Sequence, residues 1–82
     1  MKIFDTIAHE VRKEVMASGR GRLVESSIRI ESHGTLEGQD RGVWGARFAY
    51  DTCEGRRSWA DAFYTEDGTR VSEVFWVGGY RA

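Results

Sequence analysis

The chain has 82 residues, of which 40% are hydrophobic and 30% charged, with a formal net charge of −1. This composition predicts one ordinary globular domain over residues 1–82. It excludes the strong positive field of a general nucleic-acid or membrane binder. No apolar run approaches the roughly 20 residues of a transmembrane helix, and Cys53 is the single cysteine, which suits a reducing compartment. We therefore expect a soluble, cytoplasmic protein.

Residues 2–17 carry the one convincing helical pattern. Apolar side chains recur there at helical spacing, and polar side chains fill the opposite side. Ser18 and Gly19 follow as a natural end of the helix. The apolar stripe consists of Ile3, Phe4, Ile7, Ala8, Val11, Val15 and Met16.

Residues 22–32 are predicted to form a strand, because apolar and polar side chains alternate along them. Val24, Ile28 and Ile30 point to one face in this pattern. A polar connection of about ten residues, His33 to Gly42, follows the strand and exceeds the usual hairpin loop of about 2–5 residues.

Three further strands are expected near residues 43–51, 56–64 and 69–77. The stretch from Trp44 to Tyr80 carries nine of the ten aromatic side chains. Two short turns, at Glu54-Gly55 and at Asp67-Gly68, would join the strands as hairpins. The predicted fold class is therefore α+β: one N-terminal helix packed on a four-stranded antiparallel sheet, largely a meander.

Two-residue turns at both hairpins fix which residues face each other, and hence which share a face of the sheet. Tyr50 would then lie opposite Trp59, and Trp59 opposite Trp76. The face under the helix would collect Trp44, Phe48, Tyr50, Trp59, Phe63, Val74 and Trp76. The open face would collect Arg47, Ala49, Arg57, Ala60, Ala62, Tyr64, Val71, Glu73, Phe75 and Val77.

The residues with catalytic or metal-binding chemistry are few and scattered. His9 and Glu10 begin a metalloprotease-like pattern, but Lys13 stands where the second histidine would be needed. Nothing in the sequence brings His33 close to Cys53. Asp61 falls on the expected core face, where a carboxylate needs a partner. A structural ion pair or hydrogen bond, with Arg29, Arg47 or Trp44 Nε1 as the partner, or an error in the expected register explains it better than catalysis. We expect neither an enzyme nor a metal or cofactor site.

A sheet with two partly apolar faces and only one helix to cover them indicates a protein-binding module. The expected binding surface is the open face, with Arg47, Arg57, Tyr64, Phe75 and Val77. It would meet either a foreign protein or a second copy of the chain in a homodimer. The long loop supplies the next candidates, Glu37, Asp40 and Arg41.

In size, single-domain economy and lack of catalytic residues, the chain resembles the small phage-encoded inhibitors of bacterial defence, above all the anti-CRISPR proteins. The resemblance is one of general character and involves no shared motif. It implies binding to a CRISPR effector complex and steric blocking of DNA recognition or nuclease recruitment, and it assigns no role to any residue.

A small nucleic-acid-binding protein is the alternative. Arg20, Arg22, Arg56 and Arg57 lie in Gly-flanked positions that could contact phosphates, and sheet aromatics could stack on bases. Because acidic residues slightly outnumber basic ones, this partner is less expected than a protein.

Overall fold

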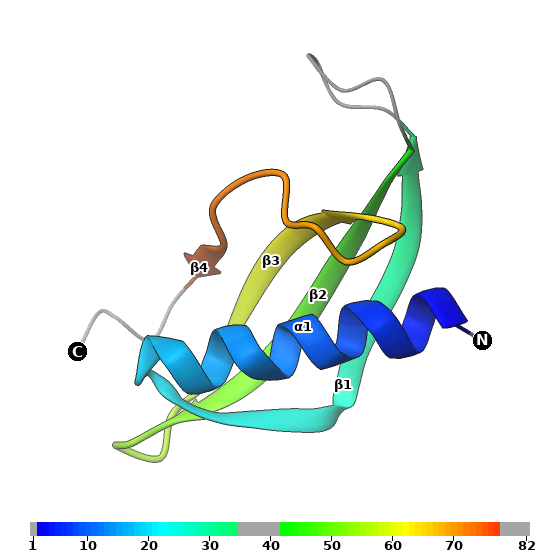
Figure 1. Cartoon of the computed structure of the whole chain (residues 1–82). Helices are drawn as coiled ribbons and strands as arrows, with labels where there is room; N and C mark the ends of the chain where they lie inside the picture. Colours follow the sequence, from blue (N-terminus) through cyan, green and yellow to red (C-terminus); the bar gives the residue numbers. More distant parts are fainter. Residues whose placement is uncertain (1, 35–41, 78–82) are drawn as a thin grey trace.

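The computed structural model describes residues 2–34 and 42–77. Within these ranges, a single helix crosses one face of a four-stranded antiparallel sheet whose strands follow one another in chain order (Figure 1). This confirms the α+β fold class and the meander order expected from the sequence. The elements are α1 (Lys2–Ser18), β1 (Gly21–Gly34), β2 (Val43–Thr52), β3 (Arg57–Thr65) and β4 (Phe75–Val77).

Helix α1 is held on the sheet by its apolar stripe. Ile7, Ala8, Val11 and Val15 are all buried against the sheet. Met16, at the end of the predicted stripe, is 83% exposed instead. A helix of this length is marginal in water by itself, so this burial is what keeps it folded.

Strand β1 does not keep the simple alternation that its sequence predicts. Its pairing with β2 shifts between Val24 and Arg29, and the strand turns a corner there (Figure 1). The Ser27 hydroxyl holds the corner by donating a hydrogen bond to the Val24 carbonyl (2.6 Å) and accepting one from the Ala49 amide (2.7 Å). Such bulges bend a strand and change which face its side chains take. Ile28 keeps its expected place in the core, and Val24 pairs on the opposite face.

The hairpin between β2 and β3 has one residue more than expected. The Thr52 amide donates to the Arg56 carbonyl (2.8 Å), which leaves Cys53, Glu54 and Gly55 as a three-residue loop. Gly55 has a φ of +83°, the left-handed conformation that glycine adopts at no steric cost. The expected two-residue turn was therefore wrong by one position.

That single position turns β3 over, because neighbouring residues of a strand face opposite sides of the sheet. Tyr50 lies opposite Ser58 rather than Trp59. Tyr64, expected on the open face, is fully buried in the core, together with Ala60 and Ala62. The three residues expected in the core that lie on the open face instead are Trp59, Asp61 and Phe63.

The second hairpin also has a three-residue loop, so it restores β4 to its expected orientation. Thr65 donates its amide to the Thr69 carbonyl (2.8 Å), and Gly68 has a φ of +91°. Phe75 and Val77 therefore lie on the open face, as predicted. Strand β4 is shorter than the expected 69–77, because only Phe75–Val77 pairs as a named strand with β3.

Aromatic rings close the core at the C-terminal end of α1. Trp76 packs edge-on against Tyr50 and Phe48, with ring centroids 5.4 and 6.1 Å apart. The Arg20 guanidinium lies 4.9 Å from the centre of the Trp76 ring, a cation–π contact. This side of the sheet is therefore covered by α1 and Trp76, and a binding surface on the sheet would lie on the other side.

Candidate functional site

The open face is the side of the sheet that α1 does not cover. Strands β3 and β4 give it four large apolar side chains that adjoin one another. Trp59 pairs directly with Val77, and the Phe63 and Phe75 rings meet edge-on at 6.4 Å. We call this group the apolar patch: Trp59, Phe63, Phe75 and Val77.

The apolar patch is accessible to a partner. Trp59 is 45% exposed, and Phe75 and Val77 are each 54% exposed. Single exposed apolar residues are ordinary on a protein surface, but contiguous ones mark interaction sites. Tryptophan and other aromatic residues are also the side chains that most often anchor protein interfaces.

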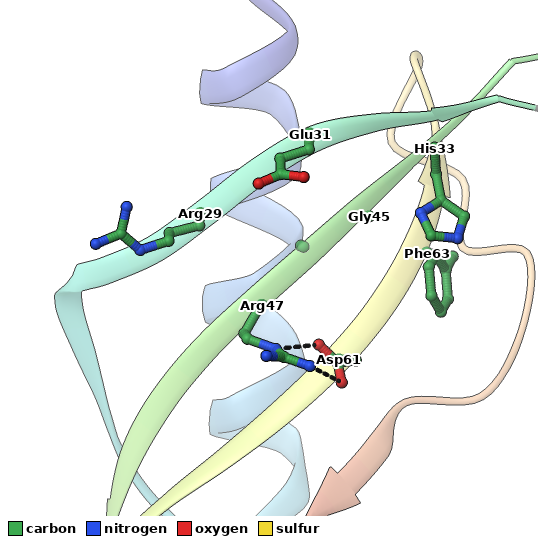
Figure 2. Close-up of a pocket in the computed structure, with 8 residues that line it drawn as sticks. Arg29, Glu31, His33, Gly45, Arg47, Asp61 and Phe63 are labelled. Carbon is green, nitrogen blue, oxygen red and sulfur yellow. Dashed lines mark hydrogen bonds and ion pairs between the residues drawn. The ribbon is translucent and has the colours of Figure 1, made fainter.

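A hollow lies beside the apolar patch, toward β1 (Figure 2). Its volume is about 360 Å³, near the lower limit of about 300–1,000 Å³ for small-molecule sites. Figure 2 shows the charged and aromatic side chains that surround Gly45 at its centre. The hollow is lined by Arg29, Glu31, His33, Gly45, Ala46, Arg47, Asp61 and Phe63.

Gly45 makes the hollow possible because it has no side chain. It lies directly opposite Phe63 in the β2–β3 pair. A Cβ atom at this position would lie 3.2 Å from Phe63 Cε1 and 3.6 Å from His33 Nδ1. The His33 and Phe63 rings contact each other at a centroid distance of 4.8 Å and form an aromatic wall next to it.

Arg47 and Asp61 form the opposite wall of the hollow. They face each other across β2 and β3, and the guanidinium donates to both carboxylate oxygens at 2.8 and 3.2 Å. The hydrogen bond to Asp61 raises the pKa of Arg47. The sequence left an ion pair or a register error open for Asp61, and the structure has both: Arg47 is the partner, and the register of β3 differs by one residue. The pair lies on the open face, not in the core where Asp61 was expected.

A second cross-strand pair lies farther along the same face. Arg57 donates to both carboxylate oxygens of Asp51, at 2.6 and 3.2 Å. This hydrogen bonding lowers the pKa of Asp51. Both open-face arginines that the sequence selected are therefore already neutralised by an aspartate, so they serve better as a polar rim than as free cations.

Arg29 and Glu31 differ from these pairs. Neither side chain forms a hydrogen bond or ion pair with any residue in the described ranges, 2–34 and 42–77. Both are exposed, two positions apart on β1. In Figure 2 the Glu31 carboxylate lies beside Gly45, whereas the Arg29 side chain extends away from it. Among the described residues, Glu31 is thus the acidic side chain beside Gly45 that has no direct hydrogen-bond or ion-pair partner, although its charge contributes to the raised pKa of Arg47.

The structure brings together only part of the predicted site. Arg47, Arg57, Phe75 and Val77 share the open face, whereas Tyr64 is in the core. The loop candidates Glu37, Asp40 and Arg41 lie outside the described residues.

Sequence reasoning missed Trp59, Phe63 and His33, all of which belong to the open face or its hollow. One signal was available: Trp59 and Phe63 share their strand face with Asp61. A carboxylate is costly to bury without a partner, so a face that carries one favours solvent.

The arginines of the nucleic-acid alternative do not form one free basic surface. Arg57 is paired with Asp51, and Arg20 lies over Trp76. Arg56 also has an interaction partner.

Within residues 2–34 and 42–77, no group of three His, Cys, Asp or Glu side chains is placed to hold a metal ion. Cys53 is exposed in the β2–β3 loop. The one helix in the described part of the chain is not long and apolar enough to cross a membrane. Compared with models of protein families, with curated proteins and with solved structures, the chain gives no significant match.

Proposed function

We propose that this chain is a non-enzymatic protein-binding module that acts through its open face. The observation that carries the proposal is the apolar patch. It places a tryptophan and two phenylalanines on one sheet face across β3 and β4, with Trp59 and Phe75 about half exposed. Burying such rings against a partner is worth about 25 cal/mol per Å² of apolar area before the costs of association.

The surroundings of the apolar patch support the same function. The Arg47–Asp61 pair reaches into the apolar patch, because Asp61 lies on β3 opposite Phe75. The Arg57–Asp51 pair lies beyond Trp59, toward the β2–β3 loop on the same face. Protein interfaces combine apolar and aromatic anchors with polar groups that are already hydrogen-bonded. Cross-strand pairing also fixes these side chains on a rigid sheet, so little ordering entropy is lost on binding.

The partner that we propose is a subunit of a CRISPR effector complex in the bacterial cytoplasm, inhibited by steric blocking. Support for this finer proposal is the resemblance in size and single-domain construction to anti-CRISPR proteins. A cell-based test is direct: the chain is expressed in bacteria with active CRISPR immunity, and phage plating is counted. Restored plating, together with co-purification of the effector complex, is the expected result.

A paired variant tests whether the apolar patch is the working surface. Trp59→Ala with Phe75→Ser removes the two exposed rings and should reduce partner capture by at least about a hundredfold, since anchor residues typically contribute 2 kcal/mol or more each. Met16→Ser is the matched control, because Met16 is exposed on the helix, away from the open face. A folded double variant that keeps full capture would refute the proposal.

The same variants separate the other possible partners. Loss of a wild-type dimer in light scattering would show that the open face binds a second copy of the chain. Nucleic-acid binding has one favourable observation, the exposed Trp59 and Phe75 rings on which bases could stack. That binding would be strong at low salt and fall steeply as salt rises.

A further inference from the structure

The hollow on the open face has the charge and shape to accept one side chain of the partner. We infer that this side chain is basic, an arginine or lysine that enters over Gly45 with its charge beside Glu31. The inference rests on the proposed protein-binding function and gives its partner a chemistry. It follows from which charges around the hollow are already satisfied.

The two arginines that line the hollow are poorly placed to bind an anion over Gly45. Arg47 is held by both oxygens of Asp61. Arg29 lines the rim but extends away from Gly45 (Figure 2). Within residues 2–34 and 42–77, an anion entering over Gly45 would therefore have no free cation beside it and would meet the Glu31 carboxylate.

The Glu31 carboxylate remains available as a hydrogen-bond acceptor. Glu31 forms no hydrogen bond or ion pair within residues 2–34 and 42–77. A guanidinium beside it would gain a charge-assisted hydrogen bond, among the stronger contacts available at a surface. Asp61 lies across the hollow and could share a second hydrogen bond without leaving Arg47, because a carboxylate has about four acceptor sites.

The remaining walls suit the rest of a basic side chain. The His33–Phe63 ring pair stands beside the floor that Gly45 leaves open. Aromatic faces attract cations, and the alkyl stem of an arginine or lysine packs well on rings. The volume of about 360 Å³ accommodates a group of this size.

Nuclear magnetic resonance titration with small probes tests the inference without knowledge of the partner. The probes are acetyl-arginine amide, its uncharged analogue acetyl-citrulline amide, and acetyl-aspartate amide. Acetyl-arginine amide should give saturable amide shifts at Glu31, His33 and Gly45. Acetyl-citrulline amide and acetyl-aspartate amide should give none.

Two variants tie those shifts to the hollow. Glu31→Gln removes the charge and keeps the shape of the side chain, so it should weaken the binding of acetyl-arginine amide by roughly tenfold or more. Gly45→Ala places a methyl group against Phe63 and should also prevent entry. Glu54→Gln makes the same charge change in the exposed β2–β3 loop and should leave binding unchanged.

Three results would overturn the inference. The wild type could give no amide shifts with acetyl-arginine amide, acetyl-citrulline amide could give equal shifts, or the binding of acetyl-arginine amide could survive Glu31→Gln. Stronger binding of acetyl-aspartate amide would overturn it as well and would assign an anion to Arg29. These outcomes are separate from failure of the proposed function, because Trp59 and Phe75 do not line the hollow. Their substitution reports on partner capture alone.

Discussion

The β3–β4 turn packs against α1, and replacing its glycine, Gly68, should show how much stability depends on this close contact. Gly68 has a φ of +91°, so Gly68→Ala forces a Cβ atom into the left-handed conformation at a cost of about 1–2 kcal/mol. The new methyl group would also lie 2.9 Å from Thr6 Cγ2 and 3.3 Å from Glu10 Cγ. Overpacking of this kind costs about 1–3 kcal/mol more, so we expect a total loss of about 2–5 kcal/mol.

Gly55→Ala is the matched control, because Gly55 occupies the corresponding position of the other three-residue loop. Its φ is +83°, yet a Cβ atom there would meet nothing within 4 Å. Only the conformational cost of about 1–2 kcal/mol applies. For a domain of this size, each kcal/mol of lost stability lowers the melting temperature by about 4–8 °C. Gly68→Ala should therefore melt at a clearly lower temperature than Gly55→Ala.

Chemical denaturation followed by tryptophan fluorescence measures both free energies of unfolding. Thr6→Ser removes the methyl group that the new Cβ atom would strike, so the double variant should recover part of the loss in Gly68→Ala. Equal destabilisation by Gly68→Ala and Gly55→Ala would refute the reasoning, since it would mean that the turn does not press on α1. An absence of coupling with Thr6→Ser would lead to the same conclusion.

Two further predictions concern the core. Burial, with a smaller effect of Glu14, raises the pKa of Tyr64 above its ordinary value of 10.0. Its contribution to stability is thus complete below about pH 10 and is lost as the pH rises further. Tyr64→Phe should remove this alkaline loss in denaturation measured against pH; an unchanged profile would contradict it. Ile7→Asp should abolish cooperative melting by circular dichroism, because it buries an unpaired charge, whereas Ile7→Val should cost only about 0.5–1.5 kcal/mol; near-wild-type melting of Ile7→Asp would remove Ile7 from the core.

Local patterns along the chain were enough to predict the elements and their order. The stripe on residues 2–17 has one dominant period, so it could form only an amphipathic helix with Ile7 and Val11 inward. The turn signals at Gly55 and Gly68 located both hairpins. Four strands in succession, joined by such turns, favour a meander, and the structure has that order.

The residues of the candidate site depend on the length of each turn, which the sequence does not specify. Glu54-Gly55 can close a hairpin as a two-residue turn or as the end of a three-residue loop, and both use the glycine. The difference of one residue exchanges Tyr64 for Trp59 and Phe63 on the open face. Packing of the core decides between them, because Ala60, Ala62 and Tyr64 join the buried cluster that includes the apolar stripe of α1.

The hollow depended on tertiary structure for the same reason. Gly45, His33 and Asp61 come from three different strands, and only the register of those strands brings them together. The pairing of Arg47 with Asp61 likewise needs the two residues to lie directly opposite each other. Sequence alone determined that this protein has a sheet with a free apolar face, because each strand's alternation is local. Only the tertiary structure decided which side chains form that face, because register is a property of pairs of strands.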